Sequence, residues 1–169
     1  MEQESVYTEK RGPLTIRIEQ DRDPQSPQEM GDDNLFLVHY HRDFWQENKL
    51  VKEDDFSDEE RMKELRKSFW IFAVAAYIHS GVVLSLLVDE WNSYLSGNVY
   101  GYVVGAVFVS KEEWRLSKKA RKAASSLIDS WNSYLSGNVY GYVVGEDGES
   151  LDSCWGFYGD EERGKEYFQ

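Results

Sequence analysis

The fold of this chain is decided by residues 110–158, which read SKEEWRLSKKARKAASSLIDSWNSYLSGNVYGYVVGEDGESLDSCWGFY. The first part predicts a helix over residues 110–136. Ser110 followed by Glu113 has the form of a capping box, and Gly137 stands where a left-handed C-cap belongs. One apolar stripe recurs every three or four positions: Leu116, Ala120, Ala123, Leu127, Trp131 and Leu135. We expect this stripe to pack the helix across a sheet.

The second part of the same stretch predicts a β-hairpin. Residues 139–144 (VYGYVV) and 151–158 (LDSCWGFY) have the composition of strands, and the turn sequence GEDGE separates them. A long helix together with an antiparallel hairpin indicates an α+β fold.

Toward the N-terminus the pattern predicts two more strands. Residues 14–19 (LTIRIE) alternate apolar with polar side chains, as a half-buried strand does, and a second strand begins at 35–41 (LFLVHYH). The intervening residues 21–33 contain two prolines and a glycine and are expected to form an exposed loop. We expect residues 1–12 and 160–169 to be loose tails, since they are polar or acidic.

A short helix and a long apolar run follow. Ser57 and Glu60 have the form of a second capping box, so a helix is expected over residues 58–67. Residues 69–88 (FWIFAVAAYIHSGVVLSLLV) are almost wholly apolar and long enough for a membrane helix. The polar residues 79–81 (HSG) stand at the middle, where a hairpin needs its turn and a membrane span would be least stable. We therefore expect two buried strands, with the membrane helix as the alternative.

Fifteen residues occur twice without a difference. Residues 91–105 and 131–145 both read WNSYLSGNVYGYVVG, and two copies are too few for a solenoid. In the second copy the segment is expected to contain the end of a helix followed by the start of a strand. The first copy follows an apolar strand with no residue placed to cap a long helix, so we expect residues 99–109 to form one long strand or a strand with a bulge at Gly105.

Size and composition predict a single α+β domain over residues 1–169. In this prediction a mostly antiparallel sheet combines the N-terminal strands, the apolar hairpin, residues 106–109 and the C-terminal hairpin. The long helix packs across one face, and there is a short second helix. The single cysteine and the absence of a signal peptide after Met1 favour a reducing cytoplasm. The net charge of −12 disfavours non-specific nucleic-acid binding by the whole chain and favours basic partners.

Five motifs spread over most of the chain resemble those of a known group of proteins. Residues 138–144 (NVYGYVV) and 151–159 (LDSCWGFYG) are similar to its ending, 77–81 (YIHSG) and 105–114 (GAVFVSKEEW) to its middle, and 14–27 (LTIRIEQDRDPQSP) to its opening. The group is a family of small acidic proteins encoded by bacteriophages and mobile elements, largely without assigned activity. In that family VYGYVV occurs once, so the first copy is a departure from the pattern. The resemblance implies a phage accessory protein in the cytoplasm of a bacterial host, and it supplies no catalytic residues.

Two patterns are candidates for sites of chemistry. His39, His41 and Asp43 alternate, so on a strand they would share one face and could bind zinc with a fourth ligand such as Cys154. The competing interpretation is a strand face that happens to carry histidines, and no CxxC or HExxH spacing lies nearby. Cys154 itself is expected in a central strand as a small buried hydrophobe, rather than as a nucleophile. We therefore expect no enzyme, no catalytic residue, no cofactor and no metal.

Two charged segments predict interaction surfaces instead. The first is acidic and could dock on a basic groove or imitate a phosphate backbone, although it could also be a solvated surface. Its residues are Asp32, Asp33, Glu53, Asp54, Asp55, Asp58, Glu59 and Glu60. The second lies in the first half of the long helix and could track phosphates, with tyrosines of the repeat stacking on bases. Its residues are Arg115, Lys118, Lys119, Arg121 and Lys122.

The leading hypothesis is thus a non-enzymatic phage accessory protein that inhibits a host defence nuclease, of CRISPR or restriction type, by binding it through the acidic surface. The alternative is a nucleic-acid-binding accessory protein that uses the basic helix face. A metal-dependent enzyme at the histidines is the third possibility.

Overall fold

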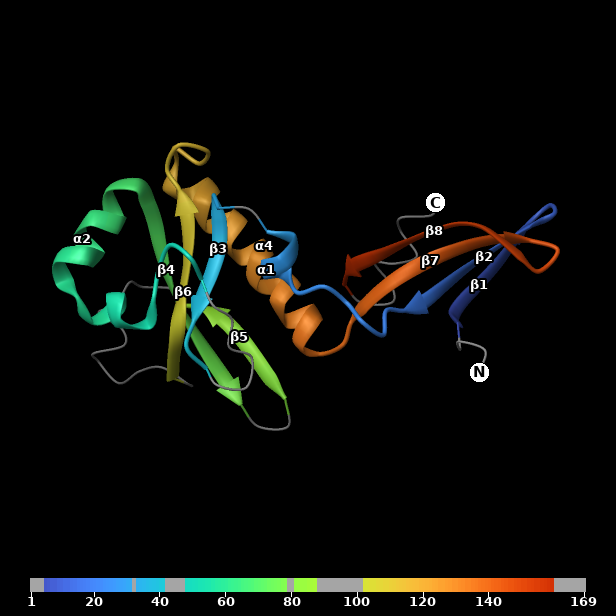
Figure 1. The fold of residues 1–169 in the computed structure, drawn as a ribbon, viewed down its shortest axis with the longest axis horizontal. Helices are drawn as coiled ribbons and strands as arrows, with labels where there is room; N and C mark the ends of the chain where they lie inside the picture. The colour runs from blue at the N-terminus through green and yellow to red at the C-terminus, as the bar shows by residue number, and fades with distance from the viewer. Residues whose placement is uncertain (1–4, 32, 42–47, 79–80, 88–101, 160–169) are drawn as a thin grey trace. The chain divides into compact units, whose positions relative to one another are not determined.

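The computed structural model describes residues 5–31, 33–41, 48–78, 81–87 and 102–159 (Figure 1). They form antiparallel sheets and helices, which confirms the α+β class. The helical elements are α1 (Pro27–Met30), η1 (Glu53–Ser57), α2 (Glu59–Ser68) and α4 (Ser117–Leu135). The strands are β1 (Ser5–Arg11), β2 (Leu14–Gln20), β3 (Leu35–His39), β4 (Phe69–Ile78), β5 (Val82–Leu86), β6 (Tyr102–Ser110), β7 (Val139–Glu146) and β8 (Glu149–Tyr158).

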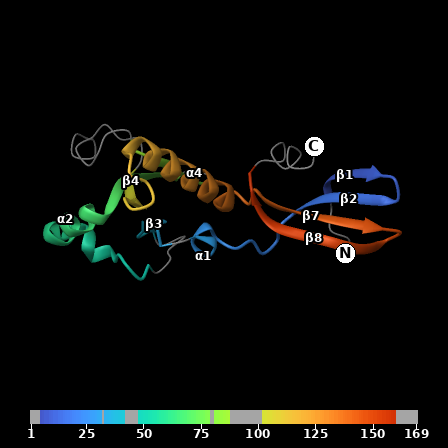
Figure 2. The same cartoon turned by 90° about the horizontal axis from the view of Figure 1, so that it is seen from above.

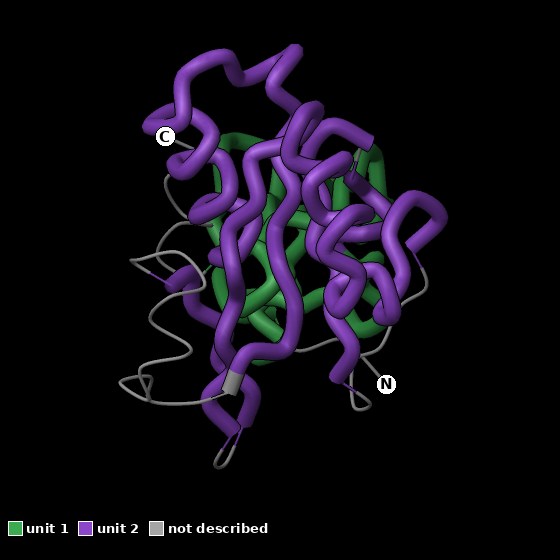
Figure 3. The backbone as a smooth tube through the Cα atoms, turned by 90° about the vertical axis from the view of Figure 1, so that its left-hand side faces the viewer, with its two compact units in different colours: residues 1–26, 130–169 green, residues 27–129 purple. Residues whose placement is uncertain are grey.

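The prediction of one sheet is wrong. The described strands form two four-stranded sheets, ordered β1-β2-β7-β8 and β3-β6-β4-β5. The chain divides accordingly into two compact units, a terminal unit of residues 1–26 and 130–169 and a middle unit of residues 27–129 (Figure 3). The sequence patterns predict most of the strands but not their neighbours, because pairing across more than a hundred residues, as between β2 and β7, leaves no local signal.

The terminal unit closes its sheet with tight turns. Asp147 and Gly148, with φ of 48° and 90°, join β7 to β8 in a two-residue hairpin, which confirms the expected C-terminal hairpin. At the other edge, β1 pairs with β2, so the expectation of a loose tail is wrong for residues 5–11. Their polar composition suits an edge strand whose side chains alternate between half-buried and exposed. Residues 160–169, the other expected tail, lie outside the described residues.

The middle unit is built around β6, which pairs with β3 on one side and β4 on the other. Val74 lies opposite Gly105 and Ala75 opposite Val103, so Val104 is an extra residue and the expected bulge lies next to Gly105. Residues 99–101 of the expected strand lie outside the described residues. The predicted apolar hairpin is also confirmed, as β4 and β5 are antiparallel neighbours. No helix in the described part of the chain has the length and apolar character needed to cross a membrane.

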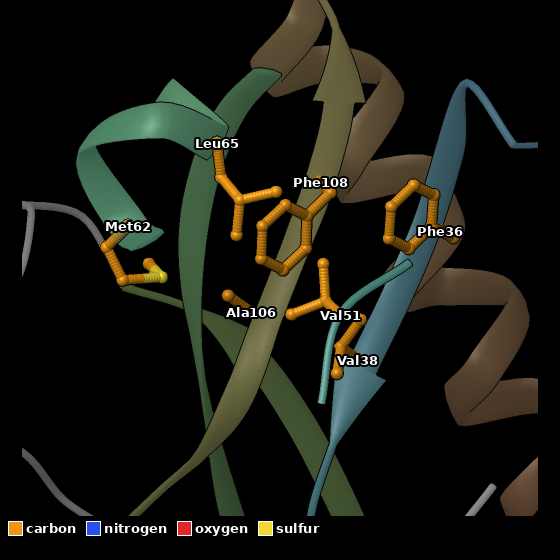
Figure 4. Close-up of a cluster of buried hydrophobic side chains, with 7 residues drawn as sticks. All are labelled: Phe36, Val38, Val51, Met62, Leu65, Ala106 and Phe108. Atoms are coloured by element: carbon orange, nitrogen blue, oxygen red, sulfur yellow. The ribbon is translucent and has the colours of Figure 1, made fainter. Parts of the chain in front are cut away.

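A hydrophobic cluster covers one face of this sheet. It contains Phe36 and Val38 of β3, Val51, Met62 and Leu65 of α2, and Ala106 and Phe108 of β6 (Figure 4). The rings of Phe36 and Phe108 stack with their centroids 5.3 Å apart. Figure 4 shows these side chains in front of the sheet and α4 behind it, and Figure 2 shows the same elements from above. Residues 103–110 of β6 are therefore buried on both faces.

The helix α2 confirms the expected short helix, but its cap is different. Asp58, not Ser57, accepts the hydrogen bond from the Arg61 backbone N–H, at 3.0 Å. Ser57 belongs to the preceding turn η1, where its hydroxyl donates to the Asp54 carbonyl oxygen. The Asp58 carboxylate takes the capping position because the Ser57 hydroxyl already forms a hydrogen bond within η1.

The long helix α4 begins seven residues later than the capping box predicts. Ser110 is the last residue of β6, where its backbone N–H pairs with the Asn34 carbonyl oxygen. The buried stripe agrees with the predicted one at Ala120 and Trp131, but its other members are Ala124 and Ile128. Leu116 precedes the helix and is 60 % exposed, whereas Ala123 and Leu127 flank the buried face. The left-handed Gly137 after the helix is confirmed, with φ of 75°.

Candidate functional site

The predicted acidic residues fall in three places. Six of them, Glu53, Asp54, Asp55, Asp58, Glu59 and Glu60, lie on η1 and the first turn of α2, and we call this group the acidic surface. Asp33 is exposed on the segment between α1 and β3. Asp32 lies outside the described residues. The structure therefore presents one continuous acidic segment, and it supplies no contact that joins Asp33 to it.

Two members of the acidic surface hold the local fold together. The carboxylate of Asp55 accepts a hydrogen bond from the Lys52 backbone N–H at 2.8 Å and lies 3.9 Å from the Arg61 guanidinium. Asp58 is the N-cap of α2. These two carboxylates already have partners within the chain, so they are poor candidates for binding another molecule.

The other four carboxylates of the acidic surface are exposed. Glu59 and Glu60 both lie near Lys63, with N–O distances of 3.3 and 2.9 Å, in a fully solvated setting where such pairs are weak. Glu53 and Asp54 form no ion pair with another described residue. Glu53 and Asp54 are therefore the carboxylates of the acidic surface whose charge is least compensated by described neighbours.

The predicted basic residues divide in a similar way. Arg121 is half-buried, donates to the Leu87 carbonyl oxygen at 3.0 Å and lies 5.2 Å from the centre of the Phe72 ring. Arg121 therefore fastens α4 to the sheet. Arg115, Lys118, Lys119 and Lys122 are exposed, and we call these four the basic stripe. None of them forms an ion pair with another described residue.

The strand histidines do not assemble a metal site among the described residues. His39 is only 3 % exposed, and burial, aided by the nearby His41, lowers the pKa of His39 to about 4, so it is neutral at pH 7. β3 ends at His39, so the strand geometry expected to align His39 with His41 does not continue. Asp43 lies outside the described residues. No group of three or more His, Cys, Asp or Glu side chains in the described ranges could hold a metal ion.

Cys154 is placed differently from the prediction. It is exposed on β8, which is the outer strand of its sheet, and not buried in a central strand. Its cross-strand neighbour Tyr142 has its hydroxyl 3.5 Å from the Asp152 carboxylate, whose negative charge raises the pKa of Tyr142. A carboxylate beside this ring would repel phosphate, which disfavours the predicted stacking of bases on the tyrosines of β7.

One group of contacts in the middle unit, centred on the Trp70 ring, is not predicted by any pattern in the sequence. Trp70 of β4 donates its indole N–H to the Trp114 carbonyl oxygen at 2.8 Å, and the Lys111 ammonium lies 4.6 Å from the centre of the Trp70 ring. These contacts fix the connection between β6 and α4, and so they set where the basic stripe begins. Residues 44 positions apart cannot be matched by spacing alone.

A small pocket with a volume of about 50 Å³ also lies in the middle unit. Its lining includes Gln28, Asp33, Asn48 and Leu127. The Asn48 side-chain oxygen accepts hydrogen bonds from the backbone N–H groups of Leu50 and Val51, so this oxygen already has partners within the chain.

Comparisons of this chain with family models, with curated proteins and with solved structures find no match.

Proposed function

We propose that this chain is a non-enzymatic phage accessory protein that inhibits a host defence nuclease, of CRISPR or restriction type, by binding a basic surface of that nuclease. The acidic surface is the contact region. The observation that carries the proposal is the pair of exposed carboxylates at Glu53 and Asp54, which form no ion pair with another described residue. The phage assignment rests on the sequence resemblance.

The acidic surface has the properties that electrostatic docking requires. Its carboxylates lie on consecutive turns of η1 and α2, which the hydrophobic cluster beneath them fixes through Phe56, Met62 and Leu65. A rigid array loses less conformational entropy on binding than a loose acidic tail does. Nucleic-acid-binding surfaces of nucleases are rich in lysine and arginine, so a fixed row of carboxylates can compete there with phosphate.

The test is a plasmid-interference assay in bacteria. The chain is expressed in strains that carry a restriction–modification system or a CRISPR system, and each strain is transformed with a targeted plasmid. We expect expression to raise the yield of transformants in at least one strain by about 100-fold or more, as tight binding of the nuclease would. An unchanged yield in every strain would contradict the proposal.

A charge-reversal pair tests the surface itself. Glu53→Lys with Asp54→Lys should reduce the protection at least tenfold, because these two carboxylates form no ion pair with another described residue and remain available to a partner. Glu112→Lys with Glu113→Lys is the matched control, since it makes the same change of net charge at exposed positions outside the acidic surface. Equal protection by the two double variants would overturn the assignment of the surface. So would digestion of DNA by the purified chain alone, because the proposed protein performs no chemistry.

A further inference from the structure

The basic stripe is a second charged surface, and the proposed function does not use it. Its four cations, Arg115, Lys118, Lys119 and Lys122, fall within eight residues of a chain whose net charge is −12. All four are exposed and none forms an ion pair with another described residue. In contrast, the two neighbouring cations Lys111 and Arg121 each have a partner inside the fold.

The helical geometry turns the three lysines of the stripe directly away from the sheet. Successive residues of an α-helix are rotated by about 100°, so positions 118, 119 and 122 lie within one face of about 100°. The buried positions Ala120, Ala124 and Ile128 lie on the opposite side of the helix. The lysines of the stripe therefore point away from the sheet and into solvent.

The position of the stripe is unfavourable for the helix itself. Lys118 and Lys119 occupy the first turn of α4, which contains no acidic residue. The N-terminus of a helix carries a partial positive charge, so cations there are repelled and an anion is attracted. A bound anion would relieve both this repulsion and the mutual repulsion of the lysines.

The two charged surfaces lie on opposite sides of one sheet. The acidic surface belongs to η1 and α2, which pack on the face with the hydrophobic cluster, whereas α4 covers the other face (Figure 4). A ligand of the basic stripe therefore need not compete with a partner of the acidic surface.

We propose that the basic stripe binds the phosphate backbone of double-stranded nucleic acid without regard to sequence. Lys118 and Lys122 are about 6 Å apart along the helix axis, given a rise of 1.5 Å per residue. A duplex carries one phosphate per 1.7 Å of its axis, so several phosphates lie within reach of the stripe. The stripe contains no aromatic residue, and it therefore lacks the stacking platform that single-strand binding uses.

Fluorescence anisotropy of a labelled 20-base-pair DNA duplex tests this proposal with the full chain. We expect a dissociation constant on the order of 10 μM at 25 mM salt, weakened by the negative charge of the rest of the molecule. The logarithm of the association constant should fall with the logarithm of the salt concentration with a slope of about −3.6, which corresponds to four phosphate contacts. No binding at 25 mM salt, or tighter binding of the corresponding single strand, would overturn the proposal.

Matched variants distinguish the contribution of the basic stripe to binding from the effect of the net charge of the chain. The stripe triple combines Lys118→Glu, Lys119→Glu and Lys122→Glu. It should weaken duplex binding by at least tenfold more than a control triple, which combines Lys10→Glu, Lys63→Glu and Lys67→Glu. The control reaches the same net charge at exposed positions elsewhere. The stripe triple should not lower the melting temperature, because it places acidic residues at a helix N-terminus. If it fails to fold, the corresponding Gln triple takes its place. Equal weakening by the two triples would contradict the proposal.

Self-association of the chain is a competing explanation for the exposed basic stripe, and it predicts a different oligomeric state. The stripe of one copy could instead dock on the acidic surface of another, and light scattering after size exclusion at 25 mM salt distinguishes this arrangement. A monomer that binds the duplex supports the proposal. A dimer or larger species that the stripe triple returns to a monomer would overturn it.

Discussion

At the scale of single residues, the repeat allows one glycine to be compared in two settings. Gly105 in β6 and Gly145 in β7 end identical sequences. A Cβ added to Gly105 would overlap the Val38 carbonyl oxygen in the buried centre of a sheet, whereas one added to Gly145 would crowd the Glu149 carbonyl oxygen beside an exposed turn. The same residue is therefore required more strictly in the first copy than in the second.

Gly105→Ala should destabilise the fold much more than Gly145→Ala. Overpacking a buried, immobile backbone costs about 3 kcal/mol, whereas the hairpin end can shift at a cost of about 1 kcal/mol. Urea unfolding of the two variants, followed by circular dichroism, measures the difference. Equal losses of stability would show that β6 does not approach β3 as closely as the structure indicates.

The pKa of His39 predicts a dependence of stability on pH. The pKa is about 4 in the folded chain and about 6.5 when unfolded, so the unfolded state takes up the proton first as the pH falls. The contribution of neutral His39 is complete above pH 6.5 and is lost progressively between pH 6.5 and pH 4. Between pH 7 and pH 4.5 the loss should be about 2 kcal/mol.

His39→Gln isolates this effect, because glutamine does not titrate. The unfolding free energy of the variant should fall by about 2 kcal/mol less than that of the wild type over the same pH interval. Carboxylates titrate in both proteins, and their contribution cancels in the comparison. Parallel pH profiles would contradict a buried neutral His39.

At the scale of elements, the cap of α2 shows what a sequence motif can and cannot predict. The motif with Ser57 and Glu60 correctly indicates a helix start, but the structure assigns the cap to Asp58. Both serine and aspartate are good N-caps, and the choice depends on where the preceding turn η1 ends. The capping box at Ser110 misplaces the start of α4 for a related reason, because β6 continues through Ser110.

The cap assignment can be tested with two single variants. Asp58→Ala should destabilise the fold by about 1 kcal/mol, because it leaves the Arg61 backbone N–H without its acceptor. Ser57→Ala removes only an exposed hydrogen bond and should cost no more than about 0.5 kcal/mol. Thermal unfolding of both variants checks the order, and a larger loss of stability for Ser57→Ala would indicate that Ser57, and not Asp58, caps α2.

At the scale of the whole molecule, the two sheets differ in how completely they are covered. In the middle unit β6 is central, with α4 on one face and the hydrophobic cluster on the other. In the terminal unit β8 is an outer strand, and residues 149–155 are all exposed. Its Glu149 and Asp152 place charges on that edge, which discourages pairing with another strand.

The protection of backbone amides from hydrogen exchange should follow this difference in burial between β6 and β8. Protection is expected to be highest in β6, since opening it disrupts both faces and two strand pairings, and lower in the first half of β8. Exchange measured by mass spectrometry after proteolysis, at pH 7, resolves the two strands. Protection in residues 149–155 equal to that in β6 would contradict the difference in burial.

The sequence by itself determined the α+β class, most of the strands, the two main helices and the two charged segments, because periodicity, turn residues and charge are local properties. Only the tertiary structure decided the rest. It separated the strands into two sheets, showed β1 as a strand, and distinguished carboxylates and cations that support the fold from those that face solvent.

The repeat shows the physical reason most directly. In β6 both Val103 and Val104 are buried, whereas in β7 Val143 is buried and Val144 is only partly so. The residues are identical, and the difference comes from what covers each face of each strand. Local sequence sets the conformation of a strand, but its burial is a property of the neighbours that the whole fold brings to it.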